Sequence, residues 1–126
     1  MSRVLLIDDM KSSRALLRVY LMNRGFEFEE ADDGEAGLAC ARKVLPDLIV
    51  VDFHIPGMNG YEFIQRLRQV PALAQTPVIL LTSDMEQVAK LKDRALPSTA
   101  LATKPIDVAA FRSLVEQALG AVKAAS

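Results

Sequence analysis

The sequence contains little cysteine and no excess of charge of one sign. Cys40 is its only cysteine, which excludes a disulfide framework and gives no indication of an oxidising compartment. It lies in an alanine-rich helical stretch, where a small core residue is a better interpretation than a reactive thiol. The 15 basic and 16 acidic residues leave a formal net charge of −1. This balance argues against a nucleic-acid-binding surface, because such a surface needs clustered positive charge.

The chain also lacks a long apolar run. None of its apolar segments approaches the roughly 20 residues of a membrane-spanning helix. The N-terminus passes from Met1-Ser2-Arg3 directly into a short strand-like run, without the longer apolar region and cleavage site of a signal peptide. We therefore expect a cytoplasmic protein with no membrane insertion. The 126 residues and the apolar fraction of 51% are typical of one globular domain, which needs no disulfide or structural metal.

Short β-branched runs alternate with helical patterns along the chain, which is typical of stacked βαβ units. The predicted strands are residues 3–8, 26–31, 48–52, 77–82 and 99–103. The predicted helices are residues 12–23, 35–44, 60–69, 85–95 and 107–122. The third and fourth strands are uninterrupted apolar runs, as expected for parallel strands covered on both faces.

Two helices carry more detailed predictions. In the first helix, Ala15, Leu16, Val19 and Tyr20 lie on one stripe at helical spacing, and we expect this stripe to face the core. Asp107 is the expected N-cap of the last helix, because its carboxylate can accept a hydrogen bond from the first helical turn.

Polar side chains follow four of the predicted strands. Asp8 and Asp9 follow the first strand, Asp52 ends the third, Thr82 ends the fourth and Lys104 follows the fifth. The carboxyl ends of the strands are where an open parallel sheet binds ligands, so one pocket would collect these groups. Carboxylates, a hydroxyl and an ammonium together indicate a site for a hard cation and an anion. That is the chemistry of phosphate handled with magnesium.

Each of these residues also has a structural interpretation. An aspartate after a strand is often a turn or cap residue. Asp8 or Asp9, taken singly, therefore fits a structural role about as well as a functional one. Thr82 taken alone is better explained as a cap of the next helix, although Ser83 or Asp84 could cap that helix instead. The combination with Asp52 and Lys104 favours a functional site.

Four motifs, taken in their order and spacing, resemble the bacterial two-component response-regulator receiver domain of the chemotaxis-protein (CheY-like) type. They are Asp8-Asp9, Asp52 with Pro56 and Gly60 four and eight residues later, Thr82-Ser83, and Lys104-Pro105. The resemblance covers the whole chain. It implies a doubly wound, flavodoxin-like (βα)5 three-layer α/β sandwich with a five-stranded parallel sheet of order 2-1-3-4-5. It also implies a cis peptide before Pro105.

The resemblance implies a chemical role for each motif. Asp52 would accept a phosphoryl group and form an acyl phosphate. Lys104 and Thr82 would contact oxygens of that phosphoryl group. Magnesium would be held by four oxygen-donating groups, which are Asp8, Asp9, Asp52 and the backbone carbonyl of His54.

The implied function is a single-domain response regulator of a two-component or phosphorelay system. Residues 1–122 would form the receiver domain, residues 123–126 a frayed end, and no output domain would follow. A histidine kinase or histidine phosphotransfer protein would supply the phosphoryl group. The message would pass to a downstream protein through the fourth helix, fifth strand and fifth helix. We expect a phosphoacceptor rather than a turnover enzyme, a monomer or weak dimer, and no DNA binding.

Some positions depart from the family pattern. Leu101 stands where the family usually has tyrosine or phenylalanine, three residues before the lysine, and Ala100 replaces a common acid. The first change puts the aromatic part of the output switch in doubt. The second weakens the case for dimers through the fourth and fifth helices. His54, the only histidine, is equally consistent with a gate for water and with an exposed loop residue.

Other functions stay open from the sequence. A receiver-like interaction module that does not use phosphate would explain Leu101. A magnesium-dependent phosphotransferase or hydrolase with an aspartate nucleophile would use the same residues, but such enzymes usually need extra substrate-binding elements. A further alternative is that these residues were excised from a longer protein.

Overall fold

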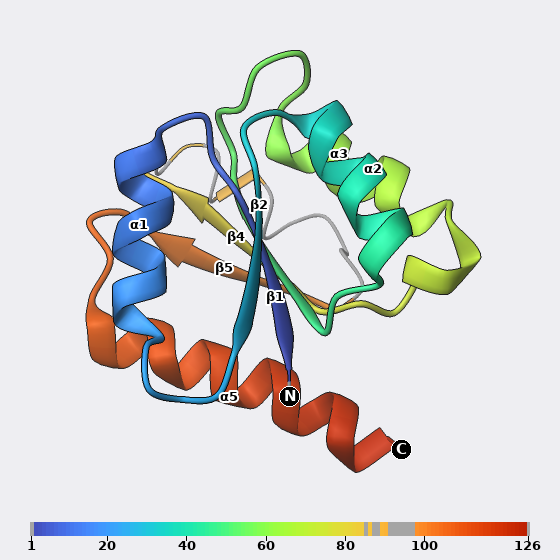
Figure 1. Ribbon diagram of the computed structural model, residues 1–126. Helices are drawn as coiled ribbons and strands as arrows, with labels where there is room; N and C mark the ends of the chain where they lie inside the picture. Colours follow the sequence, from blue (N-terminus) through green and yellow to red (C-terminus); the bar gives the residue numbers. More distant parts are fainter. Residues whose placement is uncertain (1, 85, 87–88, 91–97, 126) are drawn as a thin grey trace.

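The computed structural model describes residues 2–84, 86, 89–90 and 98–125. Its centre is a five-stranded parallel sheet whose strands lie in the order β2-β1-β3-β4-β5 (Figure 1). The strands are β1 (Arg3–Ile7), β2 (Glu27–Ala31), β3 (Leu48–Asp52), β4 (Val78–Thr82) and β5 (Thr99–Thr103). Each agrees with its predicted range to within one residue, and the predicted flavodoxin-like order 2-1-3-4-5 is confirmed.

Helices cover both faces of this sheet (Figure 1). They are α1 (Lys11–Tyr20), α2 (Gly34–Val44), α3 (Gly60–Arg68) and α5 (Val108–Ala125), with a short 3-10 helix η1 (Pro71–Leu73) after α3. α1 and α5 pack on one face, and α2 and α3 pack on the other. The three predicted layers are therefore confirmed. The helix predicted over residues 85–95 lies almost entirely outside the described residues.

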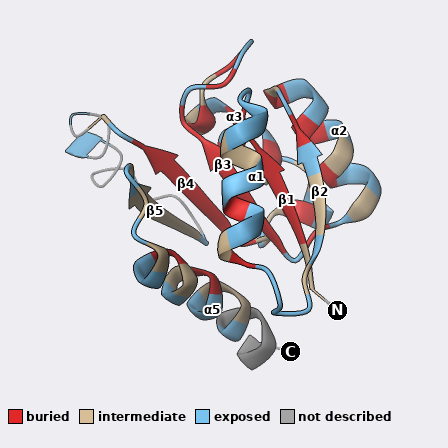
Figure 2. Cartoon of the chain, turned by 60° about the vertical axis from the view of Figure 1, so that its left-hand side comes forward, coloured by how far each residue is buried: buried red, intermediate tan, exposed pale blue. Residues whose placement is uncertain are grey.

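Two hydrophobic clusters, one on each face of the sheet, form the core. Leu5 of β1 joins Phe63 of α3 in the first cluster. Its neighbour Leu6 points to the opposite face and joins Leu17 of α1 and Phe111 of α5 in the second. β3 and β4 are buried along their whole length (Figure 2), as their uninterrupted apolar runs predict.

Cys40 of α2 is half-buried and packs against the cluster between the sheet, α2 and α3. Burial raises the pKa of its thiol, and the nearby charge of Glu29 adds to this shift. A thiol with a raised pKa is poorly ionised at neutral pH and reacts slowly. The interpretation of Cys40 as a packing residue is confirmed.

Side chains at the helix starts satisfy backbone N–H groups that have no partner within the helix. The Asp107 carboxylate accepts a hydrogen bond from the Ala110 N–H at 2.9 Å, which confirms the predicted N-cap of α5. At the start of α3, Asn59 and Glu62 form a reciprocal capping box. This box ends the loop that follows Asp52, so it restrains the backbone beside the predicted site.

The predicted inward stripe of α1 is largely wrong. Leu16 and Val19 are 48% and 54% exposed, whereas Leu17 and Leu21 are 2% and 1% exposed. α1 has apolar residues on two faces, so helical spacing alone does not decide which face turns inward. In the observed rotation Leu17 and Leu21 join the core, and Arg14 and Arg18 form ion pairs with Glu30 on the edge strand β2.

The rotation of α1 can be tested by a pair of substitutions at adjacent positions. Leu17→Ala should lower the free energy of unfolding by about 2–4 kcal/mol, because it removes a buried side chain. Leu16→Ala should change it by less than about 0.5 kcal/mol, because that side chain is half exposed. Urea unfolding followed by far-UV circular dichroism measures both. Equal losses for the two variants would contradict the observed rotation.

Candidate phosphoacceptor site

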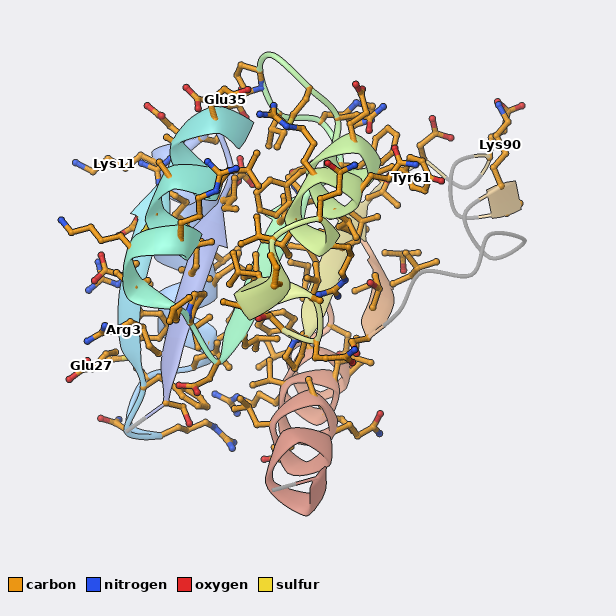
Figure 3. The ribbon with its side chains drawn as sticks, turned by 90° about the vertical axis from the view of Figure 1, so that its right-hand side faces the viewer. Arg3, Lys11, Glu27, Glu35, Tyr61 and Lys90 are labelled. Carbon is orange, nitrogen blue, oxygen red and sulfur yellow. The ribbon has the colours of Figure 1, made fainter. Side chains whose placement is uncertain are left out.

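The parallel strands all begin at one side of the sheet, which we call the amino edge, and finish at the opposite side, the carboxyl edge (Figure 3). At the amino edge, Arg3 and Glu27 at the starts of β1 and β2 form an ion pair of 2.9 Å. At the carboxyl edge, Lys11 and Glu35 lie in the first turns of α1 and α2. Each predicted site residue ends a strand or follows one at this carboxyl edge.

Strand register brings the predicted polar residues together. Ile7 pairs with Val51, so Asp8 and Asp52 come next on adjacent strands β1 and β3. Thr82 on β4 pairs with Thr103 on β5, and Lys104 follows directly. Among residues whose burial is described, the buried polar or charged ones are Asp8, Asp52 and Thr82. We call Asp8, Asp52 and Lys104 the acidic site.

Lys104 joins the two aspartates of the acidic site. Its Nζ forms an ion pair with Asp52 Oδ2 and lies 3.6 Å from Asp8 Oδ2. Burial acts to lower the pKa of Lys104, but the hydrogen bond to Asp52 and the charges of both aspartates outweigh it, so the pKa is raised. The ammonium is therefore charged at neutral pH.

The cis peptide expected before Pro105 is present.

Both oxygens of the Asp52 carboxylate are held by hydrogen bonds. Oδ1 accepts from the backbone N–H of His54 at 2.8 Å, and Oδ2 accepts from Lys104 Nζ. The backbone of this segment is held as well, because the Phe53 N–H donates to the Leu81 carbonyl at 2.8 Å. The position and the orientation of the carboxylate are thus set by the sheet and by the lysine.

Asp8 is the less satisfied of the two carboxylates. Its Oδ1 accepts from the Met10 N–H at 2.9 Å, whereas its Oδ2 is buried and accepts no hydrogen bond. Burial raises the pKa of Asp8; the Met10 N–H and Lys104 oppose this shift, and the neighbouring Asp52 adds to it. A buried carboxylate oxygen without a donor, next to a second carboxylate, is suited to a cation.

Gly60 allows the loop after Asp52 to pass close to the strand. A Cβ at this position would lie 2.9 Å from the Asp52 carbonyl oxygen and 2.9 Å from Phe53 Cα. The Gly60 N–H also donates to the Phe53 carbonyl at 2.7 Å. Gly60 thus lets the backbone of this loop pass close to the end of β3.

Other predicted residues lie at this edge without joining the acidic site. Asp9 is exposed, and the described part of the chain contains no group of three or more His, Cys, Asp or Glu residues able to hold a metal ion. Thr82 Oγ1 accepts the Asp84 N–H at 3.0 Å within the turn after β4, and Asp84 Oδ1 accepts the Glu86 N–H at 3.0 Å. The helix that Thr82 or Asp84 was expected to cap lies almost entirely outside the described residues. The Thr82 hydroxyl proton is still available for donation. His54 is exposed, and its ring packs edge-on against Phe53 with 5.0 Å between centroids.

Sequence reasoning missed one residue that touches the acidic site. Arg14 of α1 donates through Nη1 to the backbone carbonyl of Asp8 at 2.5 Å. A backbone acceptor leaves no trace in the sequence. The spacing of six residues between Asp8 and Arg14 would have indicated only that the arginine lies one turn into the following helix.

Comparison with known proteins identifies the class of protein. The chain matches the response regulator receiver domain family over residues 4–116. It is 32% identical over 106 residues to the response regulator PleD of Caulobacter vibrioides, covering 84% of this chain and 23% of PleD. The chain thus spans about a quarter of that relative. It is 30% identical to a probable chemotaxis protein CheY of Rhizobium etli, covering 96% of this chain and 95% of that protein.

A solved structure supports the same class. The chemotaxis response regulator CheY4 of Vibrio cholerae superposes with a TM-score of 0.84 at 31% identity, covering 94% of this chain and 99% of that one. The chain therefore belongs to the response regulator receiver domain family, whose members act in two-component signalling. It is a receiver domain of the CheY-like type, and such domains are signalling domains rather than classical enzymes. Among the described residues, no helix has the length and apolar character needed to cross a membrane.

The raised pKa of Asp8 predicts how stability depends on pH. A carboxyl group whose pKa is raised on folding contributes stability below its ordinary pKa of about 4, and this is lost as pH rises through the folded value. Asp8→Asn carries no charge, so it should be more stable than the wild type at pH 7 without divalent cations. The gain should shrink toward pH 4. Urea unfolding in EDTA at several pH values measures it.

The exposed neighbour provides the control for this prediction. Asp9→Asn removes the same charge one residue away and should change the free energy of unfolding by less than about 0.5 kcal/mol at pH 7. A destabilised Asp8→Asn at pH 7 would show that the Asp8 carboxylate is well compensated in the folded chain.

Proposed function

We propose that this chain is a phosphorylation-controlled signalling switch whose phosphoacceptor is Asp52. The observation that carries the proposal is the setting of its carboxylate. One oxygen is held by the His54 N–H and the other by Lys104, beside the second carboxylate of Asp8. Phosphoryl transfer depends mostly on such positioning and on neutralising charge, rather than on elaborate covalent chemistry.

In the proposed step, a carboxylate oxygen of Asp52 attacks the phosphorus of a phosphohistidine. The donor is a histidine kinase or a histidine phosphotransfer protein. The O–P bond forms as the N–P bond of the donor breaks, and the imidazole nitrogen keeps the electron pair of that bond and takes up a proton. The product is an acyl phosphate on Asp52.

Mg²⁺ fits the residues at this edge. Asp8 Oδ2 is buried without a hydrogen bond, and Lys104 links it to Asp52. Magnesium is commonly bound by one or two carboxylates and keeps several waters. Asp8 and Asp52 would hold the ion, with Asp9 and the backbone carbonyl of His54 as further ligands. Once bound, the ion supplies positive charge that offsets the carboxylates and the incoming phosphoryl group.

Lys104 and Thr82 would transmit the presence of the phosphoryl group. Lys104 Nζ now bonds to Asp52 and would turn to a phosphoryl oxygen, while the Thr82 hydroxyl would donate to another. Lys104 N–H also donates to the Thr82 carbonyl at 3.0 Å, so the two residues are linked through β4 and β5. Movement at either residue would therefore shift the edge strand β5 and the start of α5.

The partners follow from this mechanism. The chain would receive its phosphoryl group from a histidine-containing protein in the cytoplasm and signal to a downstream protein by contact. It would act as a monomer or weak dimer, without binding DNA. It would not turn over a small-molecule substrate, because the phosphoryl group stays on Asp52 until water removes it.

Intact mass after incubation with acetyl phosphate tests the phosphoacceptor. The wild type should gain one phosphoryl group only when Mg²⁺ is present, and Asp52→Asn should gain none. Asp32→Asn serves as a matched control, because it removes an exposed carboxylate that follows β2 at the same edge of the sheet. It should be labelled like the wild type.

The alternatives give different results in this experiment. Undiminished labelling of a folded Asp52→Asn would refute Asp52 as the sole acceptor. No adduct, with beryllofluoride binding also absent, would favour an interaction module that does not use phosphate. Sustained hydrolysis of a small phosphoester would instead favour an enzyme.

The role of Lys104 can be tested separately. Lys104→Ala should keep its magnesium-dependent labelling, slowed by about tenfold or more because one charge-stabilising group is lost. Its amide resonances should shift on beryllofluoride binding only around Asp52, because the side chain that joins the phosphoryl group to the end of β5 is gone. Two-dimensional NMR of both proteins measures the extent of the shift. A full wild-type pattern of shifts in Lys104→Ala would rule out this role.

A further inference from the structure

The loop between β1 and α1 carries Asp8 and Asp9, and a side chain from α1 holds it. Arg14 Nη1 donates to the Asp8 carbonyl at 2.5 Å. This side chain is 14% exposed, whereas that of Arg18, one turn further along α1, is 53% exposed. Arg14 is therefore tucked against the loop, and Arg18 stays largely at the surface.

The contact between Arg14 and the Asp8 carbonyl restrains the backbone of both Asp8 and Asp9. The Asp8 carbonyl belongs to the peptide unit that joins Asp8 to Asp9. Because a peptide unit is planar, holding its oxygen also sets the direction of the Asp9 N–H and of the chain that follows. Two further bonds restrain the same loop, from the Asp8 N–H to the Ala31 carbonyl at 3.1 Å and from the Met10 N–H to Asp8 Oδ1 at 2.9 Å.

Arg14 is itself held in place by Glu30 of β2. Its Nε donates to Glu30 Oε1 at 2.7 Å, and Arg18 donates to the other oxygen at 2.9 Å. Burial acts to raise the pKa of Glu30, but the two arginines outweigh it and the pKa is lowered. Arg18 also lies over the Phe28 ring, 5.5 Å from its centroid. The Glu30 carboxylate thus ties the edge strand β2 to α1, and Arg14 connects both to the β1–α1 loop.

We propose that Arg14 is a positioning residue of the acidic site. It holds the β1–α1 loop in the conformation in which Asp8 and Asp9 receive a divalent cation, and Glu30 fixes Arg14 for this task. The inference rests on the proposed function, since it concerns the cation that serves phosphorylation. Groups that orient metal ligands commonly change metal affinity 10- to 100-fold when they are removed.

Magnesium titration of three variants tests this role. The chain has no tryptophan, so amide chemical shifts in two-dimensional NMR report the binding. Arg14→Met keeps the length of the stem and removes the donors, and it should raise the apparent Kd for Mg²⁺ by about tenfold. Arg14→Lys should lie between it and the wild type, because an ammonium reaches one acceptor where the guanidinium reaches two.

Arg18→Met is the matched control. It removes an arginine from the same helix and the same Glu30, but Arg18 donates to Glu30 and it is Arg14 that holds the Asp8 carbonyl. Its Kd for Mg²⁺ should stay within about twofold of the wild type. Without metal, the amide resonances of Asp9 and Met10 should move in Arg14→Met and stay in place in Arg18→Met. Urea unfolding in EDTA shows whether the two variants lose similar stability, which separates positioning from general destabilisation.

The outcomes separate this inference from the proposed function. Wild-type magnesium affinity in a folded Arg14→Met, or an equal loss in Arg18→Met, would overturn the role of Arg14 alone. Absence of Mg²⁺ binding by the wild type would overturn both proposals. A wild type that binds Mg²⁺ but is never labelled at Asp52 would overturn the proposed function. The role of Arg14 would then still be decided by the magnesium affinities of the variants.

Discussion

The mutual repulsion of two buried carboxylates, offset by one ammonium, is the constraint on which this structure depends. Asp8 and Asp52 end adjacent strands, so the parallel register that builds the core also forces them together. Lys104 compensates their charge only because β4 and β5 extend the sheet on the far side of β3. The compensation is incomplete, since one oxygen of Asp8 is buried without a hydrogen bond. The negative charge at this site is therefore only partly neutralised, and a bound cation would be stabilised there.

Most of the sheet and the acidic site could be predicted because their signals are local in the sequence. An apolar run that stops at Asp52 identifies a strand and a site residue at the same point. The strand order is not local, and it came from the resemblance of four motifs to a family. The rotation of α1 was predicted wrongly, because the helix carries apolar residues on two faces and their spacing does not choose between them. Arg14 escaped notice because its acceptor at the site is a backbone oxygen.

Thr82 shows how a structural and a functional role can share one side chain. Its oxygen accepts a backbone N–H within the turn after β4, and its proton remains available for a second partner. Sequence reasoning set a capping role against a phosphate-binding role, yet a hydroxyl is both acceptor and donor, so a bond within the turn leaves the second role open. Leu101 is different: it is half-buried on β5 and packs against the core cluster beside α2 and α3, as an ordinary strand residue does.

The half-buried thiol of Cys40 has a practical consequence. With a raised pKa and a place against the core, it is a slow nucleophile at neutral pH. A cysteine introduced at an exposed position of α1, such as Val19, would outcompete it for an alkylating reagent. The native chain can thus accept a spectroscopic label on α1 without prior replacement of Cys40.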